Sequence, residues 1–208
     1  IHLNGDMSFG AGENHQRLSS LLELLMQSFK LTSLTVAVCG ALASACVSAE
    51  QYGQLIGPNI TGQDEIIVGT PQSPITQVPA VFVNGGYPSG VLDTNEGGVI
   101  SIYANNYAVS LGVSAKSLTI GSEKTDNLSI GVESSSLESY AVNSFSSDET
   151  KLNAKNIAIT ANSESGPIFG LRNQSDGKVI VGSSDTASVS IDAASKTGLA
   201  HAIYNQFN

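Results

Sequence analysis

A repeated stretch decides the fold: residues 157–174 read IAITANSESGPIFGLRNQ, and residues 189–206 read VSIDAASKTGLAHAIYNQ. The two segments align without a gap, with apolar residues over apolar ones and a shared Asn-Gln pair at the end. A repeat of this kind is typical of solenoids, in which each unit buries its apolar face against the next. We expect Asn173 and Asn205, which are equivalent in the repeat, to stack as a ladder.

A second, shorter echo has a larger offset and places AKSLTI at 115–120 over AKNIAI at 154–159. Because the two offsets differ, the sequence predicts turns of variable length between strands that keep their register. Apolar and small residues alternate, as expected for strands with one buried face. The pattern recurs at residues 65–68, 80–83, 99–102, 117–120, 128–130, 140–142, 156–159, 168–171, 178–181, 188–191 and 201–203.

Short strands at this spacing fit either an antiparallel sandwich or barrel, or a parallel solenoid. Three features favour the solenoid: the repeat unit holds two or three strands, hairpin dipeptides are scarce, and small residues crowd the strands and turns. The sequence therefore predicts an all-β fold, a right-handed parallel β-helix with coils of about 20 to 25 residues. We expect the coils to span residues 99–208, after a Pro-rich N-terminal cap segment at 50–98.

The composition excludes several classes of protein. The chain has 208 residues, a net charge of −9, 13% charged residues and 41% hydrophobic residues. Such an acidic chain has too few basic side chains to neutralise phosphates, so we expect no nucleic-acid partner. The hydrophobic content, combined with few charges, is enough to bury a core and argues against disorder.

The segment that begins at Met26 has the order of a secretory signal peptide. A basic residue comes first, an apolar run follows at 31–42, and small residues lead to Ala49. The apolar run is too short and too rich in small polar residues for a membrane-spanning helix. We predict a helical signal peptide at 26–49, with cleavage between Ala49 and Glu50.

The start and the processing of this leader leave alternatives open. Met7 is a second candidate start, and residues 1–25 are interpreted as an upstream translated stretch or leader. Cys46 follows small residues and is the candidate lipidated residue of a lipoprotein signal. Both cysteines, Cys39 and Cys46, precede the predicted cleavage, so the mature chain would have no disulfide and would depend on its core for stability.

Nothing in the predicted mature sequence has the pattern of a catalytic, cofactor-binding or metal site. Its one histidine, His201, lies in a predicted strand and is interpreted as a surface or edge residue, and the lack of cysteine excludes zinc-thiolate and thiol chemistry. Residues 175–178 match Ser-x-x-Lys but fall in a predicted turn. Asp176, Asp185 and Asp192 are interpreted as solvated loop residues, not as a carboxylate cluster. We therefore expect a protein that is not an enzyme.

Residues 26–208 resemble the passenger region of bacterial type V autotransporters, the pertactin-like and adhesin group. The resemblance rests on the signal peptide, the acidic and cysteine-poor chain, and coil-like segments such as AKNIAI at 154–159, AKSLTI at 115–120 and GLAHAIYN at 198–205. It implies a surface-displayed or secreted passenger that acts as a β-helical stalk or adhesin scaffold. It also implies export to the outer membrane, the cell surface or the medium of a Gram-negative bacterium.

The resemblance implies partners as well. Proteins of this group end in a membrane-spanning β-barrel translocator, which we do not find in residues 1–208, so we expect the chain to be a fragment with that barrel as its own export partner. A host surface or a carbohydrate would be the ligand. Two alternatives remain: a secreted β-helical carbohydrate-active enzyme similar to polysaccharide lyases, and a lipid-anchored surface protein attached through Cys46.

Overall fold

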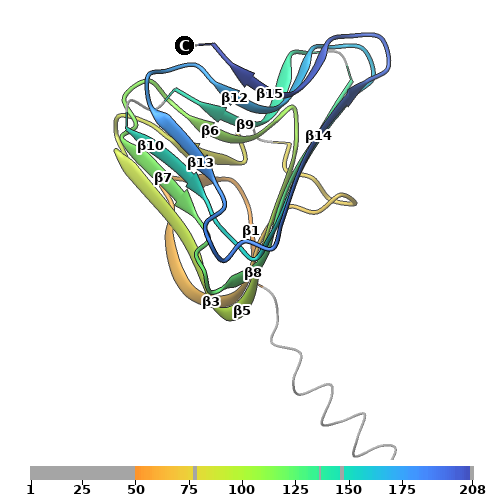
Figure 1. Ribbon diagram of the computed structural model, residues 1–208. Coiled ribbons are helices and arrows are strands. Elements are labelled where there is room, and N and C mark those ends of the chain that lie inside the picture. The colour runs from red at the N-terminus through yellow and green to blue at the C-terminus, as the bar shows by residue number, and fades with distance from the viewer. Residues whose placement is uncertain (1–49, 77–78, 136, 146–147, 207–208) are drawn as a thin grey trace, which may run out of the picture. The chain divides into compact units, whose positions relative to one another are not determined.

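The computed structural model describes residues 50–208, apart from 77–78, 136, 146–147 and 207–208 (Figure 1). The predicted leader, the signal peptide, Cys46 and Ala49 lie outside the described residues. Every element in the described part is a β-strand, which confirms the all-β prediction. None of the described residues belongs to a helix that is long and apolar enough to cross a membrane.

In the part of the chain that the structure describes, fifteen strands form two sheets in which every paired strand runs parallel to its neighbour. The strands are β1 (Glu50–Tyr52), β2 (Leu55–Ile56), β3 (Asn59–Val68), β4 (Val81–Val83), β5 (Ser89–Asn105), β6 (Tyr107–Leu111), β7 (Ser117–Ile120), β8 (Thr125–Ser134), β9 (Ser139–Ser144), β10 (Glu149–Leu152), β11 (Asn156–Ser163), β12 (Ile168–Asn173), β13 (Lys178–Val181), β14 (Ser188–Ser195) and β15 (Ala200–Asn205). One sheet has the order β15-β12-β9-β6-β4-β2, and the other contains β1, β3 and the path β13-β10-β7-β5-β8-β11-β14.

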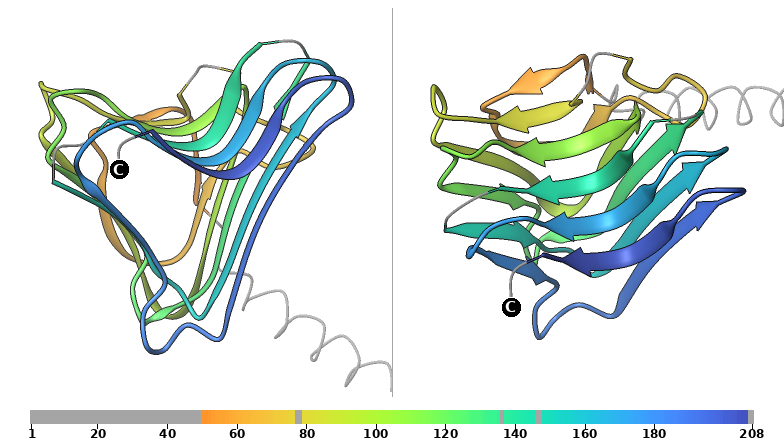
Figure 2. Two further views of the ribbon diagram at one scale, coloured as in Figure 1. Left: turned by 45° about the horizontal axis from the view of Figure 1, so that its top comes forward. Right: turned by 90° about the horizontal axis from the view of Figure 1, so that it is seen from above.

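The larger sheet folds around a corner because β3 and β5 are long enough to belong to two faces. The first part of β5 pairs with β7, and its last part pairs with β8. The solenoid therefore has three faces, which we name the β7 face (β7, β10, β13), the β8 face (β8, β11, β14) and the β9 face (β2, β4, β6, β9, β12, β15). Figure 2 shows the coils stacked along one axis and winding as a right-handed helix, as predicted.

The gapless repeat in the sequence gives the true stacking register of the last two coils. Ile157 pairs with Val189 in the β8 face, and Leu171 pairs with Ile203 in the β9 face. The Asn ladder is also confirmed, because Asn173 Nδ2 donates to Asn205 Oδ1 at 3.1 Å. The repeat therefore reports which residues lie over one another.

The shorter echo and the predicted coil length are wrong as guides to the stacking. Ser117 pairs with Glu149, and Asn156 pairs with Asn127, so 115–120 and 154–159 lie on different faces. The two segments look alike because each starts at a corner with a buried alanine followed by lysine. One full coil runs from Val81 to its partner Val109, which is longer than predicted because each coil holds three strands and three corners.

The coils begin before the predicted boundary at residue 98. That residue lies within β5, and β1 to β4 pair in the same ladders as the later strands. The described residues from β1 to β15 thus form one continuous parallel β-solenoid of about five turns.

The interior is filled by stacks of aliphatic side chains, one residue from each coil. In the β8 face, Ile66, Ile100, Leu128 and Ile157 stack in this way, and each is at most 2% exposed. Burying a side chain of this size contributes about 1.5 to 3 kcal/mol, so the stacks are the main source of stability. A solenoid of this kind is compatible with a stalk or scaffold.

Candidate functional site

A row of serines builds the corner where the β8 face turns into the β9 face. Ser134, Ser163 and Ser195 end β8, β11 and β14, and they pair in register from coil to coil. The Gly166 N–H donates to Ser163 Oγ at 2.9 Å, and the Gly198 N–H donates to Ser195 Oγ at 2.9 Å. At these two corners the serine hydroxyl thus accepts a backbone N–H of its own turn, and the corner repeats with the same geometry.

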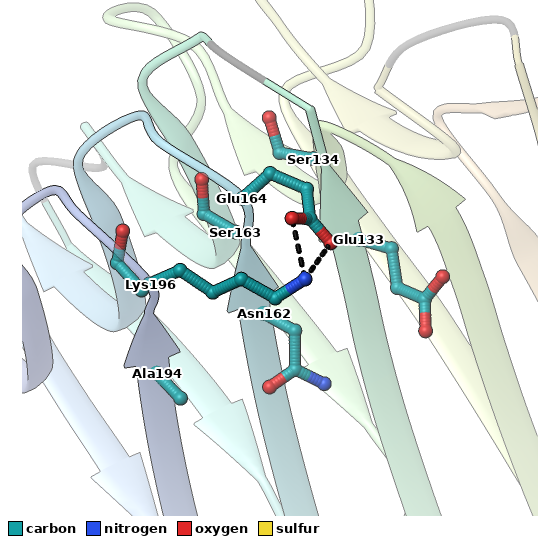
Figure 3. A pocket seen from close by; sticks show the side chains of 8 residues that line it. Glu133, Ser134, Asn162, Ser163, Glu164, Ala194 and Lys196 are labelled. Carbon is teal, nitrogen blue, oxygen red and sulfur yellow. Dashed lines mark hydrogen bonds and ion pairs between the residues drawn. The ribbon is translucent and has the colours of Figure 1, made fainter.

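A shallow groove of about 340 Å³ lies along this corner (Figure 3). Lys196 reaches across it and places its Nζ at 2.7 and 2.6 Å from the two carboxylate oxygens of Glu164, one coil earlier. Glu133 extends from the neighbouring strand, away from this ion pair. Asn162 lies between Glu133 and Ala194 in the ladder and completes the wall.

A second groove continues the first toward the earlier coils. It measures about 330 Å³, shares Glu133, Ser134 and Glu164 with the first groove, and adds Asn105 and Asn106. The walls therefore offer hydroxyl, amide and carboxylate groups along successive coils, which suits a ligand with many hydroxyl groups. Within the described part of the chain, no three His, Cys, Asp or Glu side chains come close enough to hold a metal ion.

The outer side of the β9 face carries an aromatic ladder: Tyr107, Tyr140, Phe169 and His201 occupy one register position in four successive coils. The rings of Tyr107 and Tyr140 stack with centroids 4.6 Å apart, and those of Phe169 and His201 stack at 5.5 Å. Stacked rings in neighbouring strands add about 0.5 to 1.5 kcal/mol beyond their buried area. The ladder therefore stabilises the stacking of these coils on the outer side of the β9 face.

Charged groups border the aromatic ladder. The Arg172 guanidinium lies over the Phe169 ring at 4.9 Å and forms an ion pair with Glu138. Burial raises the pKa of the Tyr140 hydroxyl, and negative charge on the neighbouring Tyr107 would raise it further. This face is thus closely packed and nearly neutral, on a chain that is acidic overall.

The residues considered from the sequence are not brought together into one site. His201 is half-buried in the aromatic ladder, where it stacks on Phe169. Ser175 lies in the predicted turn, and its Oγ accepts the Gly177 N–H at 3.2 Å. Asp176 and Asp185 are exposed in turns, as predicted, but Asp192 is part of β14 and not of a loop. Glu50, which follows the predicted cleavage site, is the first residue of β1.

Sequence reasoning missed the aromatic ladder, although the sequence contains a signal for it. An aromatic or His residue, a small residue and an aliphatic residue recur at 107–109, 140–142, 169–171 and 201–203. The small residue is skipped in the pairing of β9 with β12, so the aromatic ring points outward while the aliphatic side chain stays in the core. The alternation pattern predicts the three later segments as strands, but it does not predict that their aromatic or imidazole rings point outward.

The fold and these surfaces define a parallel β-solenoid protein with a polar corner groove and an external aromatic ladder. Comparison of the chain with protein-family models, with curated proteins and with solved structures finds no match.

Proposed function

We propose that this chain is a non-catalytic β-helical scaffold, the stalk or adhesin passenger of a protein displayed at, or released from, the surface of a Gram-negative bacterium. The observation that carries the proposal is the unbroken stack of parallel coils around one apolar core, from β1 to β15. A solenoid lengthens by adding coils, and each coil contacts only its neighbours. Such a structure can hold a binding surface away from the cell.

The sequence supports export of this scaffold. The segment 26–49 has the order of a signal peptide, and the chain after Ala49 contains no cysteine that could form a disulfide before translocation. These features are similar to those of autotransporter passengers, which implies a β-barrel translocator as the export partner and a host surface or carbohydrate as the ligand.

The export step is tested by expressing residues 1–208 in a Gram-negative host and measuring the intact mass of the exported protein. We expect a chain that begins at Glu50, and we expect Ala49→Leu to block cleavage because the site requires a small residue. A mass that includes an acyl modification, and that is lost in Cys46→Ser, would support the lipid-anchored alternative. An uncleaved chain retained in the cytoplasm would overturn the proposal.

The corner groove favours one second candidate, a secreted carbohydrate-active protein. Glu133 and Glu164 come from adjacent coils and line the same groove, and Lys196 forms an ion pair with Glu164. Glycoside cleavage by two carboxylates would require one of them to protonate the leaving oxygen. Release of reducing sugars from bacterial or plant polysaccharides, lost in Glu164→Gln and kept in the exposed turn variant Glu123→Gln, would favour this candidate over the scaffold.

A further inference from the structure

The last coil of the solenoid exposes side chains that the same fold buries one coil earlier. Val189 is 48% exposed, while its ladder partner Ile157 is 2% exposed. Ile203 is 62% exposed, while its partner Leu171 is 5% exposed. These side chains are at core positions, so their exposure means that the described residues place nothing over this end of the core.

The strand edges at this end are open as well. Strands β13, β14 and β15 are the last members of their ladders, so one edge of each has no neighbouring strand among the described residues (Figure 2). A hollow of about 440 Å³ opens at the same end, lined in part by Leu171, Val179, Ile180 and Ile203. An open parallel edge beside exposed core residues is a template for the addition of another strand.

The structure itself shows what covers an equivalent surface. The end of β11 and β12 presents Ile157, Ile159, Ala161 and Leu171, and it is covered by β14 and β15 in parallel register. The end of β14 and β15 presents Val189, Ile191, Ala193 and Ile203 at the same positions. Because the two surfaces correspond residue by residue, they fit the same kind of occupant.

We propose that the exposed end of β14 and β15 is a docking surface for a further coil, a strand–turn–strand segment with the pattern of residues 189–206 that adds parallel to both strands. A second copy of this chain fits less well, because its first coil places Glu50 and Tyr52 at the register of Ile66 and Val68. The occupant is therefore recognised by alternating aliphatic residues and by backbone hydrogen bonds, not by charge.

The probe is a fluorescent synthetic peptide of residues 187–206, titrated into the full chain. We expect saturable one-to-one binding, with slower amide exchange in β14 and β15 and unchanged exchange in β1 and β2. A peptide of the same composition in scrambled order should not bind, because its aliphatic residues would not meet the core positions.

Two variants of the full chain with the same added charge make the test specific. Ile203→Lys removes an inward aliphatic side chain at the exposed end, and we expect binding to weaken about tenfold or more. Ser190→Lys changes an exposed residue between the inward Val189 and Ile191, and binding should change by less than about twofold. Both positions are exposed, so neither variant should disturb the fold.

Two results would overturn the proposal. The first is binding without slower exchange in β14 and β15, or no binding at all. The second is a concentration-dependent dimer of the chain that slows exchange in β1 and β2 together with β14 and β15, because it would identify a second copy as the occupant.

Discussion

Two glycines at equivalent corners allow the contribution of coil stacking to be measured directly. Gly121 follows β7 and Gly182 follows β13, and both have positive φ angles, of 75° and 86°. A Cβ at Gly121 would overlap the carbonyl oxygen of Asn153, which belongs to the next coil. The three atoms nearest to a Cβ at Gly182 all belong to the side chain of Thr186 in its own turn, with Oγ1 at 3.2 Å.

Alanine at either position therefore carries the same backbone cost but a different packing cost. The left-handed backbone region costs a residue with a Cβ about 1 to 2 kcal/mol, so we expect Gly182→Ala to lose about that much stability. At Gly121, a backbone carbonyl must also move, and overpacking of this kind costs about 1 to 3 kcal/mol more. The expected loss for Gly121→Ala is thus about 2 to 5 kcal/mol.

Urea denaturation, followed by circular dichroism, measures both losses on the same chain. The m-values of the two variants should agree with that of the parent, because only then do the midpoints compare free energies of unfolding. Equal losses for Gly121→Ala and Gly182→Ala, within about 0.5 kcal/mol, would refute the reasoning. That result would mean that the coil containing Asn153 does not press on the corner before it.

Three further predictions concern the aliphatic core, the buried hydrogen bond between Ser144 and Thr150, and the aromatic ladder. Ile159→Ala, at a fully buried position, should cost about 2 to 5 kcal/mol in the same urea assay, whereas Ile203→Ala, at an exposed core position, should cost less than about 1 kcal/mol. Thr150→Val should cost about 1 to 3 kcal/mol because it leaves the buried Ser144 hydroxyl, 2.9 Å away, without this partner, and adding Ser144→Ala should recover most of the loss. The pKa of the Tyr140 hydroxyl is raised in the folded state, so the native protein keeps the hydroxyl proton to a higher pH than the unfolded chain does. The contribution of this group to stability is complete below pH 10 and is lost as the pH rises through the folded pKa. Urea midpoints between pH 9 and 11 should therefore fall less steeply for Tyr140→Phe.

The sequence predicts the strands of this fold best where neighbouring coils are most alike. The gapless repeat predicts the pairing of β11 with β14 and of β12 with β15, because nothing is inserted at the corners between them. The predicted coil length of about 20 to 25 residues is wrong, because each coil holds three strands and three corners. The shorter echo, of 115–120 with 154–159, misleads because it compares two different corners. A match of short segments therefore identifies similar turns as readily as stacked strands.

The elements that the sequence does not predict have polar residues at core positions or apolar residues outside. Strand β10 reads Glu-Thr-Lys-Leu, with an inward Thr150 that is fully buried because it shares a hydrogen bond with Ser144. Such a pairing depends on the stacking register and is invisible in one segment alone. The aromatic ladder is missed for the opposite reason, because the alternation pattern assigns large apolar residues such as Phe169 to the core.

The corners, more than the core, fix the register of this solenoid. Aliphatic residues of different size replace one another in the stacks, as Ile157 and Val189 show, so the core alone would tolerate a shift by one full period of the alternation, which keeps the aliphatic side chains inward. The corner hydroxyls do not, because Ser163 and Ser195 each bind the backbone of their own turn and end their strands at the same level. A slip of one residue would turn the aliphatic side chains outward and break these turns together. Coils of unequal length can therefore stack without disturbing the core, because the added residues are confined to the corners.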